Sequence, residues 1–286
     1  MFDQPSRKHA VAYRRTNLPE SRLDYARGRM DFDQCLGSVE GVLPSAGDLF
    51  SGKGMSGVQR AIVLAAGLGT RLKWLTRDRP KALMQVAGEP AIVHVIRRLA
   101  GYGIRDIAVN LHHHADALQQ ALGNGSRWGV SLYFSREESL LDSGGGVRTA
   151  LQVLPGSGPV LVHNGDIISD IELGRLTDIL PLGGCALPMV RNPAEHPEGD
   201  FALHGGLVSA TGKPRHTFSG VSLWQEEMLL PLAAGQAYSL VHPMRVLMRQ
   251  RRCAGYLHTG HWFDIGRPRS LIQANRYCSN PEAYDG

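Results

Sequence analysis

A glycine-rich segment and the lysine that follows it are the residues of this chain best suited to phosphate chemistry. The segment Leu64–Arg71 reads LAAGLGTR and comes directly after a short apolar run. Gly67 and Gly69 would allow a tight turn whose backbone N–H groups cradle phosphate oxygens. Arg71 offers a planar cation that can form two hydrogen bonds to the same oxygens, and Lys81 offers a compact second cation. The pattern predicts a polyphosphate site.

Other phosphate-binding loops fit this segment less well. It is not a Walker A loop, because Gly-Lys-Ser/Thr does not follow at the required spacing. It also lacks the third glycine of the dinucleotide fingerprint, which disfavours an NAD-dependent oxidoreductase. Taken alone, the segment could still be an ordinary glycine-rich turn.

A second glycine-rich segment, Leu141–Gly146, reads LDSGGG. Ser143 is predicted to cap a helix that follows, because a serine hydroxyl commonly accepts a hydrogen bond from the first helical amides. The glycines would allow another group to approach the helix N-terminus. An ordinary capped helix start is the alternative.

Two carboxylates far apart in the sequence are candidate metal ligands. Asp166 follows the apolar strand that ends in Asn164-Gly165, and Asp264 lies just beyond another predicted strand. The carboxyl ends of strands in open α/β sheets border the ligand crevice. Phosphoryl transfer needs a hard cation to balance the charge of a polyphosphate, and carboxylate oxygens suit Mg²⁺. The alternative is that Asp166 merely caps the next element.

The elements that must position these residues alternate between apolar strands and helical segments. We predict an α/β, Rossmann-like fold with a mixed, mostly parallel sheet flanked by helices. The predicted strands are Ala61–Ala66, Ile107–Leu111, Val130–Phe134, Val160–His163, Cys185–Val190, Thr217–Leu223 and Gly255–His258. The predicted helices are Ile92–Ala100, Ala115–Leu122, Val147–Leu154, Glu226–Ala234, Pro243–Arg251 and Pro268–Tyr277.

Residues 1–57 lack a sustained period of 2 or 3.6 and are predicted to form a poorly ordered extension before a domain at 58–286. A regulatory arm, or a true start at Met30 or Met55, are the alternatives. The net charge of +5 suits anionic substrates, and no nucleic-acid-binding motif is present. The four cysteines have no CxxC spacing. Without an apolar run long enough to span a membrane, or a secretory signal, we expect a cytoplasmic protein. The oligomeric state cannot be predicted.

Leu64–Arg71 followed by Pro80-Lys81 resembles the start of the sugar-1-phosphate nucleotidyltransferases, also called NDP-sugar pyrophosphorylases. Across about Gln59 to Tyr277 the chain is most similar to the N-acetylmuramate-1-phosphate uridylyltransferase branch. Further matching segments are Asn192-Pro193, Gly199–Phe201, Thr217–Gly220 and Gly260–Trp262.

The resemblance implies an enzyme that joins a nucleoside triphosphate to a sugar 1-phosphate with Mg²⁺ and takes part in peptidoglycan recycling. It implies catalytic roles for Arg71 and Lys81 and metal binding by Asp166 and Asp264. The nucleotide would contact Leu64, Ala65, Ala66, Gly67, Gly69, Thr70, Asn110, Asp142, Ser143 and Gly144. The sugar would contact Gly165, Asn192 and Asp200.

Some segments depart from that branch. Asp142 stands where glutamate is expected, and Asn110–His114 is more similar to the mannose-1-phosphate guanylyltransferases. Three adjacent histidines on a strand end point in different directions, so we expect them to line a ligand or enter a helix rather than share a metal. Mannose or heptose 1-phosphate with GTP, and phosphocholine with CTP, remain open. So does a non-catalytic sugar-nucleotide sensor.

Overall fold

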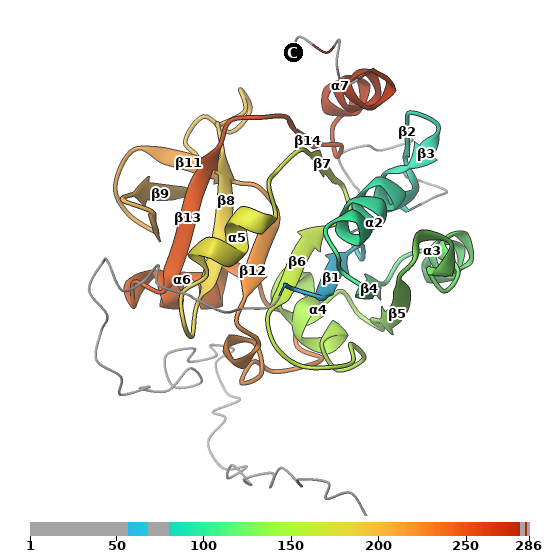
Figure 1. Cartoon of the computed structure of the whole chain (residues 1–286), viewed down its shortest axis with the longest axis horizontal. Helices are drawn as coiled ribbons and strands as arrows, with labels where there is room; N and C mark the ends of the chain where they lie inside the picture. Colours follow the sequence, from blue (N-terminus) through green and yellow to red (C-terminus); the bar gives the residue numbers. More distant parts are fainter. Residues whose placement is uncertain (1–56, 68–79, 281–283, 285–286) are drawn as a thin grey trace, which may run out of the picture. The chain divides into compact units, whose positions relative to one another are not determined.

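A ten-stranded mixed sheet organises the part of the chain that the computed structural model describes, which is residues 57–67, 80–280 and 284 (Figure 1). The strand order is β11-β9-β10-β13-β8-β12-β6-β1-β4-β5. One half is parallel and consists of β1 (Arg60–Leu64), β4 (Asp106–Leu111), β5 (Ser131–Arg136) and β6 (Val160–Asn164). The predicted Rossmann-like α/β fold is confirmed.

The other half of the sheet is mixed. Its strands are β8 (Cys185–Val190), β9 (Phe201–His204), β10 (Leu207–Ser209), β11 (Arg215–Phe218), β12 (Val221–Trp224) and β13 (Cys253–His258). Among the paired strands of this half, β8 and β13 are parallel to each other and the other pairs are antiparallel. Strand β12 pairs with β6 in the antiparallel direction and so joins this half to the parallel one. Two small sheets pair β2 (Gln85–Val86) with β3 (Glu89–Pro90) and β7 (Ile167–Ser169) with β14 (Trp262–Asp264).

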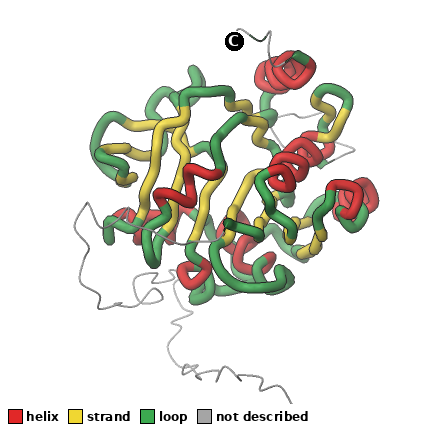
Figure 2. Tube along the Cα trace, viewed as in Figure 1, coloured by secondary structure: helices red, strands yellow, loops and turns green. Residues whose placement is uncertain are grey.

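Helices cover both faces of the sheet, as the tube in Figure 2 shows. The α-helices are α2 (Ala91–Gly101), α3 (Ala115–Leu122), α4 (Asp142–Ala150), α5 (Gly174–Ile179), α6 (Val241–Arg249) and α7 (Pro268–Ser279). Short 3-10 helices lie at Lys81–Leu83, Ser126–Trp128 and Glu226–Met228. Helices α2, α3 and α5 share one core cluster with Ala61 and Val63 of β1. Leu64 of β1 and Asn110 of β4 lie against Gly146 of α4 on the opposite face of the sheet, because side chains alternate across a strand.

Most predicted bounds agree with the structure to within two residues, but three predicted elements differ by more or are interrupted. The helix predicted at Val147–Leu154 begins at Asp142 and ends at Ala150, so the glycines lie inside it. The strand predicted at Thr217–Leu223 is broken at Gly220, whose φ of +80° takes the chain out of the extended conformation. The helix predicted at Glu226–Ala234 is only a 3-10 turn at Glu226–Met228. Pro268 opens α7 as predicted.

Residues 1–56, which hold most of the predicted extension, lie outside the described residues. Cys185, Cys253 and Cys278 are free thiols. Among the described residues, no helix has the length and apolar character needed to cross a membrane.

Candidate active site

The carboxyl ends of three neighbouring parallel strands come together at one edge of the sheet. Leu64 of β1 is in register with Asn110 of β4 on one side and with Asn164 of β6 on the other. Gly165 follows Asn164, and its N–H donates to the Leu64 carbonyl at 2.8 Å. This is the edge at which open α/β sheets bind ligands.

Asn110 holds the backbone that leaves β1. Its Oδ1 accepts hydrogen bonds from the N–H groups of Ala65 at 2.6 Å and Ala66 at 3.3 Å. Its Nδ2 donates to Oε1 of buried Glu137 at 2.7 Å, and Glu137 Oε2 accepts from the Leu141 N–H. The amides of Ala65 and Ala66 therefore donate to Asn110 in this structure, and their contact with phosphate stays a prediction.

The N-terminus of α4 is covered by another part of the chain. The carbonyl of Tyr238 accepts from the N–H groups of Gly144 at 2.9 Å and Gly145 at 3.3 Å. A Cβ on Gly145 would lie 1.9 Å from the Gln236 carbonyl oxygen, so this close approach requires glycine. The Ser143 hydroxyl accepts from the Leu240 N–H at 3.0 Å and does not cap α4, so that prediction was wrong.

A cavity of about 240 Å³ lies between these segments. Its lining brings together most of the predicted nucleotide-binding residues, namely Leu64, Ala65, Ala66, Gly67, Asn110, Asp142 and Ser143, with Lys81, Ala82, Leu140, Asn164, Gly165 and Asp166. Predicted Gly144 does not line this cavity and packs on the Tyr238 ring. Gly69, Thr70 and Arg71 lie outside the described residues.

Lys81 joins the two predicted metal ligands. Its Nζ donates to Asp166 Oδ2 and, at 3.2 Å, to Asp264 Oδ1. The Lys81 side chain is 10% exposed, whereas those of Asp166 and Asp264 are 25% and 24% exposed. Adjacent backbone holds the carboxylates together, because β7 pairs with β14 and the Ile265 N–H donates to the Asp166 carbonyl. Lys81, predicted to contact phosphate, here contacts both carboxylates.

The two carboxylates suit Mg²⁺. They supply hard oxygen donors and remain partly open to solvent, and Asp166 lies on the wall of the cavity. Among the described residues there is no cluster of three or more His, Cys, Asp or Glu side chains that could hold a metal. Proteins usually bind Mg²⁺ through one or two carboxylates plus substrate phosphates and waters.

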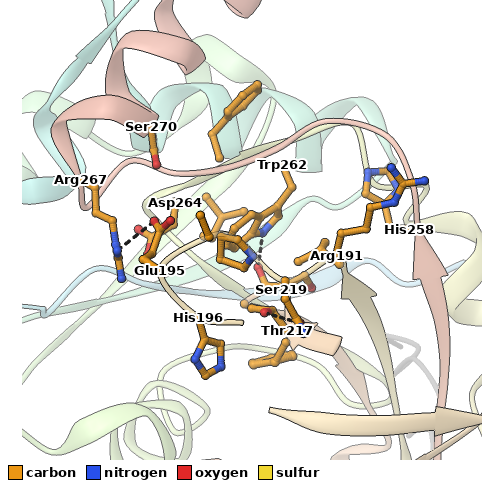
Figure 3. A pocket seen from close by; sticks show the side chains of 18 of the residues that line it. Arg191, Glu195, His196, Thr217, Ser219, His258, Trp262, Asp264, Arg267 and Ser270 are labelled. Atoms are coloured by element: carbon orange, nitrogen blue, oxygen red, sulfur yellow. Dashed lines mark hydrogen bonds and ion pairs between the residues drawn. The ribbon is translucent and has the colours of Figure 1, made fainter. Parts of the chain in front are cut away.

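A second pocket of about 750 Å³ adjoins this cavity (Figure 3). Asn164 lines both spaces, and Asp264 lines the larger one. The larger pocket also contains predicted Asn192 and Asp200, whereas Gly165 lines the smaller cavity. The acidic pair and Lys81 thus lie where the two spaces meet.

The polar atoms of Asn192 and Asp200 are engaged within the protein. Asn192 Nδ2 donates to the carbonyls of Pro197 and Arg215, and its Oδ1 accepts from the Thr217 hydroxyl at 3.0 Å. Asp200 Oδ2 accepts from the Phe218 N–H at 2.7 Å, and its Oδ1 bonds His196 at 3.0 Å. Both residues therefore shape the pocket wall.

Several residues of the site were not predicted. The Trp262 indole N–H donates to the Ser219 carbonyl at 2.8 Å, which holds the ring in the pocket wall. His258 Nε2 lies 2.8 Å from Asp170 Oδ1, and its side chain is 9% exposed. Glu137 and the Gln236–Tyr238 segment also escaped prediction, because Glu137 bonds Asn110 across 27 residues and Tyr238 bonds Gly144 across 94. Only long-range pairing could have revealed them.

The three adjacent histidines enter a helix, as expected. His114 is the N-cap of α3, with a left-handed φ of 56°. His112 Nδ1 bonds the carbonyl of Glu137 at 3.0 Å. Within the described residues they form no metal site.

Residues 60–180 match the nucleotidyl transferase family. The chain is also 38% identical over 226 residues to N-acetylmuramate alpha-1-phosphate uridylyltransferase of Neisseria meningitidis serogroup B, covering 75% of this chain and 96% of the relative. The chain belongs to the sugar-1-phosphate nucleotidyltransferase family. The relative of the same name from Caulobacter vibrioides is 33% identical over 230 residues, covering 75% of this chain and 94% of the relative. Members of this family are nucleotidyltransferase enzymes.

Solved structures share the fold of this nucleotidyltransferase. A structure titled as a putative glucose-1-phosphate thymidylyltransferase from Bacillus anthracis aligns with a TM-score of 0.68, at 20% identity, covering 77% of this chain and 95% of that one. HddC from Yersinia pseudotuberculosis, complexed with GMP-PN, aligns with a TM-score of 0.64 at 20% identity, covering 77% and 100%.

Proposed function

We propose that this nucleotidyltransferase joins UTP to N-acetylmuramate 1-phosphate, releasing pyrophosphate and forming UDP-N-acetylmuramate. The observation that carries this proposal is the meeting of two spaces at one acidic pair. Asp166 lines the 240 Å³ cavity, Asp264 lines the 750 Å³ pocket, and Lys81 bonds both. A bisubstrate transfer needs such a junction, because two anionic phosphates must approach one another.

In the proposed reaction, a phosphate oxygen of the sugar 1-phosphate attacks the α-phosphorus of the triphosphate in line. The bond from the α-phosphorus to the bridging oxygen breaks, and that oxygen leaves with pyrophosphate. The nucleophile is already an anion, so no general base is needed. The work of the protein is therefore to position the two substrates and balance their charge.

We assign Asp166 and Asp264 as the residues that would hold Mg²⁺, which when bound neutralises charge on the phosphates. Lys81 keeps the two carboxylates together in the structure described here. During transfer its ammonium would balance charge on the phosphates, with Arg71 assigned the same role from the sequence. Asn110 and Glu137 hold the backbone beside the nucleotide.

The choice of uridylyl and N-acetylmuramate is supported by the two relatives that carry this name at 38% and 33% identity. The guanylyl alternative is supported more weakly, since the Mycobacterium tuberculosis mannose-1-phosphate guanylyltransferase is 25% identical over 229 residues and this chain covers 63% of it. The peptidoglycan-recycling role and the cytoplasmic location follow from the same proposal.

A panel assay tests this proposal. The full chain is incubated with each of UTP, GTP, CTP and dTTP against N-acetylmuramate, mannose and heptose 1-phosphates and phosphocholine, and pyrophosphate release is measured. We expect the highest kcat/KM for UTP with N-acetylmuramate 1-phosphate. Chelation by EDTA should abolish turnover, and added Mg²⁺ should restore it. A higher kcat/KM for GTP with mannose 1-phosphate would replace the proposal, and sugar-nucleotide binding without pyrophosphate release would favour a sensor.

A further inference from the structure

The carboxylates that line the larger pocket are all engaged within the protein. Glu195 pairs with Arg267 at 2.9 Å, drawn as a dashed line in Figure 3. Asp200 bonds His196 and a backbone N–H, and Asp264 bonds Lys81 and the Gly266 N–H. No lining carboxylate in the described structure therefore remains to balance a further cation.

Arg191 is such a cation. It lines the pocket, its residue is exposed, and within residues 57–67, 80–280 and 284 it has neither an ion-pair partner nor a hydrogen-bond partner. The guanidinium offers five N–H donors in a planar fork that matches a carboxylate. A guanidinium with open donors on a concave wall is suited to bind an anionic group of a ligand.

The position of Arg191 separates it from the reacting centre. It directly follows β8, and Val190 is in register with His258 of β13. In the view of Figure 3, Arg191 lies on the His258 side of the Trp262 ring, whereas Asp264 and Arg267 lie on the other side. A sugar phosphate whose phosphate reacts beside Asp264 would extend its ring past Trp262 toward Arg191.

We propose that Arg191 is a specificity-determining residue that binds a carboxylate carried by the sugar ring of the substrate. This inference rests on the proposed sugar-phosphate function of the pocket. It accounts for a cation at the end of the pocket away from the reacting phosphate. N-acetylmuramate carries such a carboxylate on a lactyl ether at O3, and a uronic acid carries one at C6.

Arg267 and Arg269 are weaker candidates for this role. Arg267 already pairs with Glu195, and both arginines lie within five residues of Asp264 at the start of α7. A ligand group beside them would be the reacting phosphate itself. Arg269→Ala therefore removes the same charge from the same pocket without removing the proposed carboxylate contact.

The test compares binding of matched sugar phosphates by isothermal titration calorimetry, without turnover. The pairs are N-acetylmuramate against N-acetylglucosamine 1-phosphate, and glucuronate against glucose 1-phosphate. The proteins are wild type, Arg191→Ala, Arg191→Lys and Arg269→Ala, with Arg245→Ala, an exposed α6 residue outside the pocket lining, as the charge control. Circular dichroism establishes that each variant is folded.

We expect wild type to bind the acidic member of one pair more tightly. Arg191→Ala should raise the Kd of the acidic ligand by about 10- to 100-fold, which is the range for a lost charged hydrogen bond. The Kd of the matched neutral ligand should change by less than about 3-fold. Arg191→Lys should recover part of the loss, and Arg269→Ala should change both members by the same factor. The pair whose acidic member loses affinity in Arg191→Ala shows whether Arg191 binds a lactyl or a uronate carboxylate.

Equal weakening of acidic and neutral ligands in Arg191→Ala would overturn this inference, as would equal binding of both by wild type. Failure of the proposed reaction has a different signature. In that case wild type would discriminate the acidic ligand through Arg191 but release no pyrophosphate from it with UTP.

Discussion

The two halves of the sheet differ in what lies at the ends of their strands. In the parallel half, formed by β6, β1, β4 and β5, the side chain at the end of β4 binds the protein's own backbone, because Asn110 accepts hydrogen bonds from Ala65 and Ala66. In the mixed half, the strands end in long connections that line a pocket three times larger and present cationic side chains to it. One half holds a short loop through a strand-end side chain, and the other forms a pocket wall from the connections between its strands.

This difference is what a bisubstrate enzyme needs. A constant ligand such as a nucleoside triphosphate suits a rigid set of strand ends, whereas a variable sugar suits loops that can differ without disturbing the sheet. The junction between the halves carries Lys81 and the two carboxylates, which come from segments 85 and 183 residues from that lysine. Variants on either side should therefore separate nucleotide effects from sugar effects.

The largest effect is expected at the junction itself. Lys81→Ala should lower kcat for pyrophosphate release by about 10²- to 10³-fold, because it removes one positioned cation from the site of charge transfer. Steady-state kinetics with UTP and N-acetylmuramate 1-phosphate measure this. Lys213→Ala, in the β10–β11 connection, is the matched control. A kcat for Lys81→Ala equal to that of wild type would remove Lys81 from the reaction.

A variant in the parallel half should affect the nucleotide alone. Asn110→Ala would leave the Ala65 N–H and the buried Glu137 carboxylate without their partner. An unsatisfied buried group costs about 1–3 kcal/mol, and more if charged, so the KM for UTP should rise roughly 10-fold. The KM for the sugar phosphate should change by less than about 2-fold. A reversed pattern would contradict the division between the halves.

The matching variant in the mixed half is Asn192→Ala. Asn192 joins Pro197, Arg215 and Thr217 across the pocket wall. Its loss should raise the KM for the sugar phosphate by about 5- to 10-fold, because each hydrogen bond contributes about 1 kcal/mol and the loop can relax. The KM for UTP should stay within about 2-fold of wild type. Titration of one substrate at saturation of the other reports both values.

Strand β6, at the boundary of the parallel half, should make the stability of the protein depend on pH. His163 of β6 is in register with Val63 and Val221 and is fully buried, and desolvation lowers its pKa to about 4. In the unfolded chain a histidine has a pKa near 6.5, so the unfolded state binds more protons between pH 4 and 6.5. The stabilising contribution of neutral, buried His163 to the free energy of unfolding is therefore present above pH 6.5 and is lost as the pH falls toward 4.

Urea unfolding from pH 4.5 to 7.5 measures this effect. We expect the free energy of unfolding to fall by on the order of 1–3 kcal/mol across that window through His163, and His163→Asn should flatten the slope. His204→Asn, at an exposed strand end, is the control and should leave it unchanged. An identical slope in wild type and His163→Asn would show that other groups carry the pH dependence.

Periodicity and local signals predicted much of the fold. The helix at Ala115–Leu122 and the strand at Cys185–Val190 have the predicted bounds, because their burial patterns are regular. Local sequence misled where distant residues decide the conformation. Gly144 and Gly145, predicted to precede a helix, lie inside α4. They must be glycine because the Gln236–Tyr238 segment occupies the space that their Cβ atoms would fill.

The candidate site was predicted unevenly for the same reason. Asp166 and Asp264 could be selected as a pair from their strand ends, and the structure brings them to one lysine. The role of Asn110 in holding Ala65 depends on a contact across 45 residues, and His258 depends on Asp170 across 88. Residue type identifies a chemical capacity, whereas folded distance decides whether a ligand or the protein itself uses it.

The central claim is that Asp166 and Asp264 act as one unit at the junction of the two halves. Pyrophosphate release by Asp166→Asn, Asp264→Asn and the double variant, with Mg²⁺, UTP and N-acetylmuramate 1-phosphate, tests it most directly. We predict that each single variant loses at least about 10²-fold in kcat and that the double variant loses little more, because residues acting together are not additive. A near-normal rate in either single variant, or losses that multiply in the double variant, would contradict the claim.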